Sequence, residues 1–233
     1  MGSHASDRRS GRVIAIDGPA ASGKSSVARE LARRLGVIYV NSGAFYRAIT
    51  WYLLGQNIRP EENDRIAAAL DAAALTCTVT DNESRILVNH MDPANHLRDD
   101  RVNETVSRVS RLARVRQIVS QKLHDCATAR DVVIEGRDIG SVVFPDSPYK
   151  FYIDASPEVR LKRRAAQGER DEIAIRDHDD VSRTVSPLVI AADASVIDTS
   201  HVTIEQVVNE ILAQLEQKGL PSSDVHISGA RCQ

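Results

Sequence analysis

Residues 13–26 read VIAIDGPAASGKSS, and this stretch decides the fold. Four apolar residues and Asp17 lead into residues 18–25, which match the pattern G-x-x-x-x-G-K-[ST] at every fixed position. The two glycines free the backbone N–H groups to surround an anion, and a helix that begins near Lys24 adds its positive N-terminal end. Apolar residues recur at helical spacing until Gly36, which is typical of a helix C-terminus. The stretch therefore predicts a strand, a phosphate-binding loop and a helix, rather than an ordinary glycine-containing turn.

The chemistry of such a loop assigns roles to its side chains. Lys24 is expected to reach the β and γ phosphates of a nucleoside triphosphate such as ATP, and the Ser25 hydroxyl is expected to ligate Mg²⁺. Asp17 has two open interpretations: it orders the shell of the metal, or it accepts hydrogen bonds from local backbone N–H groups. The predicted triphosphate site comprises Gly18, Pro19, Ala20, Ala21, Ser22, Gly23, Lys24, Ser25 and Ser26.

Composition limits the classes of protein that the chain can belong to. Its 233 residues suffice for a full core and one domain, and 42% hydrophobic with 27% charged residues is typical of a globular protein. A net charge of −2 argues against a protein that mainly grips a nucleic-acid backbone. The basic residues are 25 arginines and only 5 lysines. Arginine binds phosphate through two parallel hydrogen bonds, so this bias suits an enzyme of phosphates, although a genomic preference for arginine codons is an equal explanation.

The three cysteines, Cys77, Cys126 and Cys232, lie far apart in the sequence and have no C-x-x-C spacing, so neither a disulfide framework nor a zinc site is predicted. No apolar run has the length of a membrane span, and residues 1–12 lack the apolar centre of a signal peptide. We therefore expect a cytoplasmic protein without a membrane partner.

Strand and helix patterns alternate from the phosphate-binding loop onward, which predicts a three-layer α/β fold with a central parallel sheet. Strands are predicted at 37–40, 132–134, 150–153 and 195–198, and helices at 41–54, 66–75, 98–123, 158–166 and 203–217, the last with Ile204, Val207, Val208, Ile211 and Leu215 inward. Strands at 75–80 and 85–91 around a turn at 81–84 predict a hairpin. We expect one domain over 12–218, whose core comprises 12–64 and 103–215. An inserted unit at about 65–102 is expected to move as a body, and a lid is expected at about 167–181. Disorder is predicted at 1–11 and 219–233.

Phosphoryl transfer needs little covalent help, because fixed cations meet the charge that develops on the transferred group. The pattern to look for is therefore several arginines at one edge of the sheet, and four of them lie at or beyond predicted strand ends: Arg47, Arg137, Arg176 and Arg183. Each could instead be a solvated surface charge. Arg137 is the strongest candidate, because it lies between Glu135 and Asp138 directly after an apolar strand.

Three further segments resemble the signatures of bacterial cytidylate kinases. They are SGAFYR at 42–47, EGRDIGSVVFPD at 135–146 and RTVSPL at 183–188, and with the phosphate-binding loop they follow the order of the family over about residues 12–215. The resemblance implies a P-loop nucleoside monophosphate kinase fold. It also implies transfer of the ATP γ-phosphate to CMP or dCMP with Mg²⁺, by a monomer whose partners are these small molecules.

The resemblance also implies the roles of individual residues. Lys24, Arg137, Arg176 and Arg183 would be catalytic; Arg47, Arg137 and Arg183 would hold the acceptor phosphate, while Arg176 bridges phosphates from the lid. Ser107, Arg116 and Asp138 would read the cytosine base, Asp180 would take the sugar hydroxyls, and Ser42, Tyr46 and Glu135 would complete the acceptor site. Arg160 and Arg164 would lie near the ATP base and phosphates, or else pack the lid. The chemistry agrees, because a carboxylate accepts from the amino group of cytosine while arginine or serine donates to its acceptors.

The chain departs from the family between Arg164 and Arg176, where it is shorter, so the lid is predicted to be reduced. The nearest alternative is a kinase of the same fold that acts on UMP, AMP or shikimate. A regulatory P-loop switch or a nucleic-acid-dependent ATPase is disfavoured, because the sequence has no N-K-x-D motif, no apolar strand ending in Asp-Glu and no net positive charge.

Overall fold

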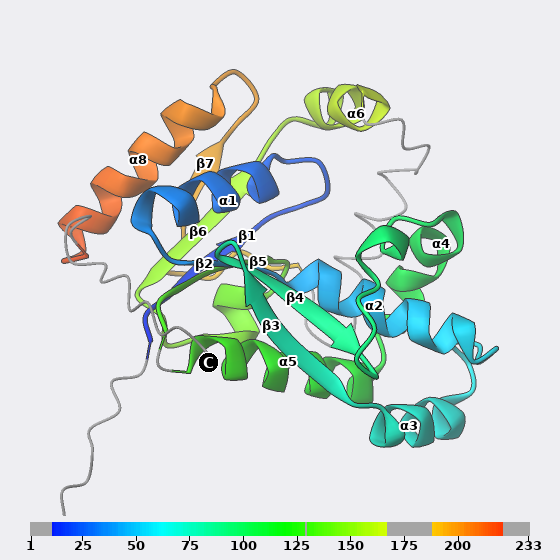
Figure 1. The fold of residues 1–233 in the computed structure, drawn as a ribbon. Helices are drawn as coiled ribbons and strands as arrows, with labels where there is room; N and C mark the ends of the chain where they lie inside the picture. Colours follow the sequence, from blue (N-terminus) through cyan, green and yellow to red (C-terminus); the bar gives the residue numbers. More distant parts are fainter. Residues whose placement is uncertain (1–10, 129, 167–187, 221–233) are drawn as a thin grey trace, which may run out of the picture.

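One sheet organises the molecule, and its strand order is β3-β4-β2-β5-β1-β6-β7 (Figure 1). The computed structural model describes residues 11–128, 130–166 and 188–220. The strands are β1 (Val13–Asp17), β2 (Ile38–Asn41), β3 (Leu75–Thr80), β4 (Glu83–Val88), β5 (Val132–Gly136), β6 (Tyr149–Asp154) and β7 (Ser195–Asp198). Neighbours from β4 to β7 are parallel, and β3 with β4 is antiparallel. The predicted parallel sheet is confirmed.

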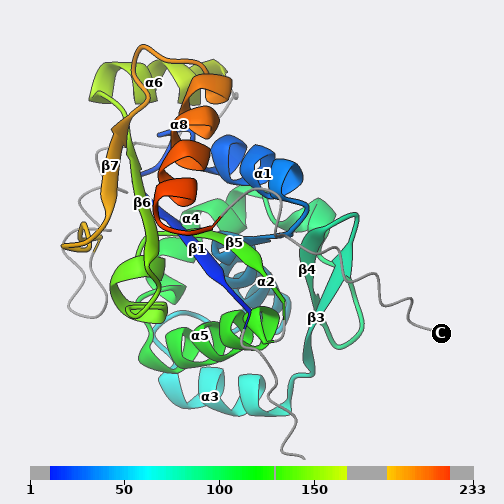
Figure 2. The same ribbon diagram turned by 90° about the vertical axis from the view of Figure 1, so that its left-hand side faces the viewer.

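Helices cover both faces of the sheet, with α1 and α8 on one side and α2 and α5 on the other (Figures 1 and 2). The helices are α1 (Lys24–Leu35), α2 (Ser42–Gly55), α3 (Asn63–Ala72), α4 (Asp100–Val109), α5 (Ala113–Ala127), α6 (Pro157–Ala166) and α8 (Ile204–Gln217). Side chains of a strand point alternately to its two faces, so Val13 and Ala15 pack toward α2 and α5 while Ile14 and Ile16 pack toward α1 and α8. This double burial is the three-layer fold that was predicted.

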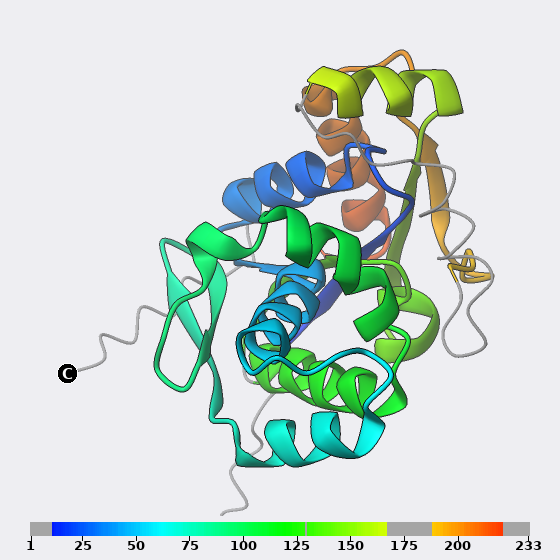
Figure 3. The ribbon, with the colours of Figure 1, turned by 90° about the vertical axis from the view of Figure 1, so that its right-hand side faces the viewer.

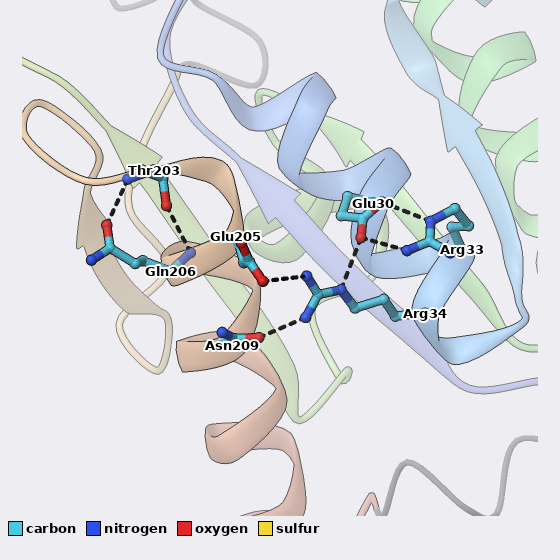
Figure 4. Close-up of polar contacts among 7 residues, drawn as sticks. All are labelled: Glu30, Arg33, Arg34, Thr203, Glu205, Gln206 and Asn209. Atoms are coloured by element: carbon cyan, nitrogen blue, oxygen red, sulfur yellow. Dashed lines mark hydrogen bonds and ion pairs between the residues drawn. The ribbon is translucent and has the colours of Figure 1, made fainter.

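Polar contacts fix α8 against α1 (Figure 4). Thr203 and Gln206 form a capping box at the start of α8, and Arg34 of α1 contacts Asn209 through a 2.6 Å hydrogen bond. Ile204 was predicted to point inward, but it is the first residue of α8 and is 46% exposed. Leu220 is 2% exposed within the same core, so packing extends past the predicted boundary at residue 218.

The predicted hairpin is present, but its turn is shorter than predicted. Only Asp81 and Asn82 form it, with φ of 52° and 59°, which suits the two-residue turns that join twisted antiparallel strands. Residues 83 and 84, assigned to the turn from the sequence, belong to β4. The hairpin joins the main sheet where Tyr39 pairs with Glu83, and the Tyr39 N–H donates to the Asn82 carbonyl at 2.8 Å.

The prediction of one long helix over 98–123 is wrong. Figure 3 shows α4 and α5 as separate helices on either side of α2, and the extended backbone at Leu112 divides them. The Ser110 carbonyl accepts a hydrogen bond from the Arg116 side chain at 3.2 Å, and the Ser110 hydroxyl donates to the Ser107 carbonyl at 3.0 Å. These contacts replace helical bonds that a continuous helix would form. Among the described helices, none is long and apolar enough to cross a membrane.

Candidate active site

A cleft of about 1280 Å³ opens where β1, β2 and β5 end. The strand register aligns Glu135 with both Ile16 and Asn41, so three strand ends deliver side chains to one edge, as expected of an open α/β sheet. Most predicted site residues line this cleft: Ala20, Ala21, Gly23, Lys24, Ser25, Ser26, Ser42, Tyr46, Arg47, Ser107, Arg116, Glu135, Arg137, Asp138 and Arg164. Arg176, Asp180 and Arg183 lie outside the described residues, as does the predicted lid at 167–181. A smaller hollow of about 620 Å³, beside His124 and Phe144, contains none of the predicted residues.

The loop between β1 and α1 has the form of an anion cradle. Gly18 has φ of 152°, and a Cβ there would lie 2.1 Å from the Ile153 carbonyl oxygen, so only glycine fits. Ala21 and Gly23 also have positive φ, of 58° and 93°. Helix α1 has no side-chain cap and no acidic residue in its first turn. Its N-terminal N–H groups therefore suit a phosphate chain.

Lys24 lies over this loop. Its side chain is buried, and Nζ donates to the Pro19 carbonyl oxygen at 3.0 Å. The ammonium group is thus held at the head of α1, where the sequence predicted it.

A carboxylate between two hydroxyls forms the floor of the cleft. Glu135 accepts from the Ser25 hydroxyl at 2.7 Å and from the Tyr39 hydroxyl at 2.5 Å, and it is only 2% exposed. Burial, together with this carboxylate, raises the pKa of Tyr39 well above its ordinary value, so the hydroxyl stays a donor. The Arg29 guanidinium lies 4.8 Å from the centre of the Tyr39 ring. Hydroxyl and carboxylate oxygens are the donors that Mg²⁺ prefers, so Ser25 with Glu135 behind it fits this ion.

Sequence reasoning missed Tyr39. It lies on a strand where an aromatic side chain ordinarily packs into a core, and its ring does belong to the core beneath α1. The one usable signal was its place two residues before the end of β2, on the same face as Asn41, whose side-chain amide donates to the Tyr39 hydroxyl at 3.4 Å.

The structure gives Asp17 a role that differs from both interpretations, because it caps backbone N–H groups that are distant in the sequence rather than local. Its two carboxylate oxygens accept from the N–H groups of Ile139 and Gly140, at 2.9 and 2.8 Å. Burial raises the pKa of Asp17 to about 6, although these two hydrogen bonds act in the opposite direction. Asp17 therefore anchors the segment that follows Asp138, which keeps that part of the cleft in place.

Arg116 and Asp138, which also line the cleft, form an ion pair whose side chains are each 6% exposed. The Arg116 guanidinium also lies 5.7 Å from the centre of the Tyr46 ring. Ser107 lines the cleft nearby, from α4. The break between α4 and α5 allows Ser107 and Arg116 to approach this region from two helices. Three of the residues predicted for the acceptor site, Tyr46, Arg116 and Asp138, are thus brought together.

Arg47 and Arg137 line the same cleft as Lys24. Arg47 donates to the Leu97 carbonyl oxygen at 2.9 Å and to Asn103 Oδ1 at 2.5 Å. Arg137 makes a longer contact of 3.4 Å to the Gly136 carbonyl oxygen. Two of the four predicted arginines therefore line one cleft, and their roles stay predictions.

Arginines of α6 contact the phosphate-binding loop, and two of them, Arg163 and Arg164, also line the cleft. Arg160 is buried, donates to the Ala155 carbonyl at 3.2 Å and to the Ala20 carbonyl at 3.4 Å, and does not line the cleft. Sequence reasoning missed Arg163, which donates to the Ser22 carbonyl at 3.1 Å and to the Thr199 hydroxyl at 2.9 Å. The sequence signal for Arg163 was weak, because the helix carries several arginines. Only its position three residues after Arg160 sets it apart from the others.

A glycine loop at the head of a helix, a parallel sheet and arginines across the cleft define a P-loop phosphotransferase. The sequence model of the cytidylate kinase family matches residues 14–217, and the chain belongs to this family. It is 38% identical over 209 residues to a cytidylate kinase of Clostridium botulinum (strain Langeland), covering 85% of this chain and 94% of the relative. It is also 38% identical over 218 residues to a cytidylate kinase of Mycobacterium leprae (strain Br4923), covering 88% and 96%. A solved gluconokinase from Sinorhizobium meliloti aligns with TM-score 0.46 and 14% identity, over 89% of this chain and 93% of that one.

Proposed function

We propose that this enzyme transfers the γ-phosphate of ATP to CMP or dCMP, giving ADP and CDP or dCDP, with Mg²⁺ bound to the triphosphate. The observation that carries the proposal is that the anion cradle with Lys24 and the buried pair of Arg116 and Asp138 line the same cleft. Membership of the cytidylate kinase family supports the same reaction.

In the donor site, the N–H groups of the loop and of the first turn of α1 bind the phosphates, and Lys24 leaves the Pro19 carbonyl for the transferred group. Ser25 would hold Mg²⁺, which neutralises phosphate charge when it is bound. Glu135 fixes the direction of the Ser25 hydroxyl because it accepts a hydrogen bond from that group. This arrangement orients the serine oxygen before any ligand arrives.

In the acceptor site, Arg47 and Arg137 would bind the phosphate of CMP, each through paired hydrogen bonds, and Arg183 would join them. Asp138 would accept from the amino group of cytosine, while Arg116 and Ser107 donate to its ring acceptors. Asp180 would take the sugar hydroxyls, and Arg176 would bridge the phosphates. The acceptor phosphate is already ionised at neutral pH, so no general base is assigned.

Closure completes this proposal. We expect nucleotide binding to draw residues 65–102 and 167–181 toward the cleft and so exclude water from the transferred phosphoryl group. Arg47 supports such coupling, because its hydrogen bond to the Leu97 carbonyl joins α2 to the first of these segments. A cytoplasmic monomer that has only small-molecule partners is part of the same proposal.

A panel of acceptors tests the reaction. Purified enzyme with ATP and Mg²⁺ is offered CMP, dCMP, UMP, AMP and shikimate, and ADP formation is coupled to an optical readout. CMP or dCMP should give the highest kcat/KM. A tenfold preference for AMP over CMP, or ATP hydrolysis without acceptor phosphorylation, would contradict the assignment.

A further inference from the structure

Two cysteines meet at the edge of the sheet, away from the cleft. Cys77 of β3 and Cys126 of α5 are 49 residues apart, and their Sγ atoms lie 2.8 Å apart. Both are free thiols and both are half-buried. The pairing was not predicted, because the contact joins a strand to a helix that is distant in the sequence. Neither residue lines the cleft.

The surroundings of the pair make the two sulfurs unequal. A hydrogen bond from Cys126 lowers the pKa of Cys77, and the nearby charges of Lys122 and Arg130 act in the same direction. The same hydrogen bond and burial raise the pKa of Cys126, and Asp125 adds to this shift. The nearby positive charges of Lys122 and Arg130 favour Cys77 as the attacking thiol.

We propose that Cys77 and Cys126 form a dithiol site that a low-molecular-weight disulfide oxidises reversibly. The Cys77 thiolate attacks one sulfur of the oxidant, which forms a mixed disulfide and releases one thiolate. Cys126 then loses its proton and attacks the Cys77 sulfur, which forms the Cys77–Cys126 bond and releases the second thiolate. Two electrons pass from the protein to the oxidant, and the two protein protons end on the two released thiols.

The bond would act at the edge of the sheet. Strand β3 is at the end of the sheet and pairs only with β4 among the described strands. Cys77 faces Ile86 in that pairing, and Ile86 lines the cleft with its neighbours Ser84 and Arg85. A link to α5 would therefore tie the hairpin, and this wall of the cleft, to the core.

The test uses a Cys232→Ser chain, in which Cys77 and Cys126 are the remaining thiols. The protein is equilibrated with reduced and oxidised glutathione, both folded and unfolded in urea, quenched with acid, and analysed by mass spectrometry. Folded protein should lose two hydrogens and yield a peptide that joins the two cysteines. Its effective thiol concentration should exceed that of the unfolded chain about 100-fold or more, because the fold holds the sulfurs together.

Controls separate a built site from ordinary thiol chemistry. In the same background, Cys77→Ser and Cys126→Ser should each stop at a single mixed disulfide with glutathione. The oxidised parent should melt about 5 °C higher than the reduced parent, because the link closes a long loop. Equal effective concentrations in the folded and unfolded chains, or mixed disulfides as the main folded product, would overturn the proposal. No readout depends on kinase activity, so the result is independent of the proposed function.

Discussion

Replacing Arg116 with methionine tests whether the buried pair in the proposed acceptor site has both a structural and a recognition role. The change removes a cation from a contact in which both side chains are 6% exposed and leaves the Asp138 carboxylate buried without it. Breaking such a pair from one side costs about 3–5 kcal/mol. The lost hydrogen bond to the Ser110 carbonyl adds about 1 kcal/mol. We expect the free energy of unfolding to fall by about 4 kcal/mol or more.

Urea unfolding followed by circular dichroism measures the stability term, and steady-state kinetics with CMP measures recognition. A double variant with Arg116→Met and Asp138→Asn should recover at least half of the lost stability, because no unpaired charge then stays buried. The same double variant should keep a kcat/KM for CMP at least about 100-fold below the parent, since neither group can bind cytosine as a charge. Stability and recognition should therefore separate.

A cost of less than about 1 kcal/mol for Arg116→Met would refute the structural role, because the pair would then not be desolvated as its burial indicates. The recognition role fails if the double variant uses CMP as well as the parent does. In that case the pair would be purely structural, and the base would bind elsewhere.

Three further predictions address the remaining parts of the site. Arg137→Ala should lower kcat/KM about 10³-fold in steady-state assays without changing stability, because it removes a cation from a site whose catalysis is electrostatic. The surface control Arg33→Ala should change neither kcat/KM nor stability. An Arg137→Ala enzyme whose kcat/KM lies within tenfold of the parent would refute this role. Glu135→Gln should raise the Mg²⁺ concentration for half-maximal activity about tenfold, because Ser25 loses its anionic acceptor, and an unchanged Mg²⁺ titration would count against it. Asp17 has a folded pKa of about 6 against an ordinary 3.8, so the folded state binds its proton more tightly and the fold loses stability as pH rises through this window. Relative to Asp17→Asn, the parent should therefore lose about 2–3 kcal/mol between about pH 4 and pH 7 in urea unfolding, and a pH-independent difference would contradict the assignment.

The parts of the fold that local chemistry controls were predictable from the sequence. The phosphate-binding loop needs glycine where a Cβ would strike the Ile153 carbonyl, so its motif is visible in the sequence alone. Helix ends were also predictable from the sequence. Gly36 ends α1 in a left-handed conformation with φ of 67°, and the Asn41 side chain caps α2 by accepting from the Ala44 N–H at 3.1 Å. The alternation of strand and helix patterns along the chain then predicted the three layers.

The parts that depend on contacts between distant segments were not predictable. The break at 110–112 arises because Arg116 reaches both the Ser110 carbonyl and Asp138, and helical periodicity carries no sign of either contact. The Tyr39 hydroxyl reaches Glu135 only because β2 pairs with β5 in the folded sheet. Cys77 and Cys126 likewise meet only through the packing of β3 against α5. The roles of the cleft residues stay predictions. Arg176, Asp180 and Arg183 lie outside the described residues, so their roles also stay predictions.

The central claim is that a triphosphate at the head of α1 and a cytidine monophosphate face one another in one cleft. A crystal structure with CMP and a non-hydrolysable ATP analogue tests it most directly. We predict triphosphate oxygens on the N–H groups of residues 18–26, and the cytosine amino group within hydrogen-bonding distance of Asp138. A CMP phosphate that points away from Lys24, or a base that leaves Arg116 and Asp138 untouched, would contradict the claim.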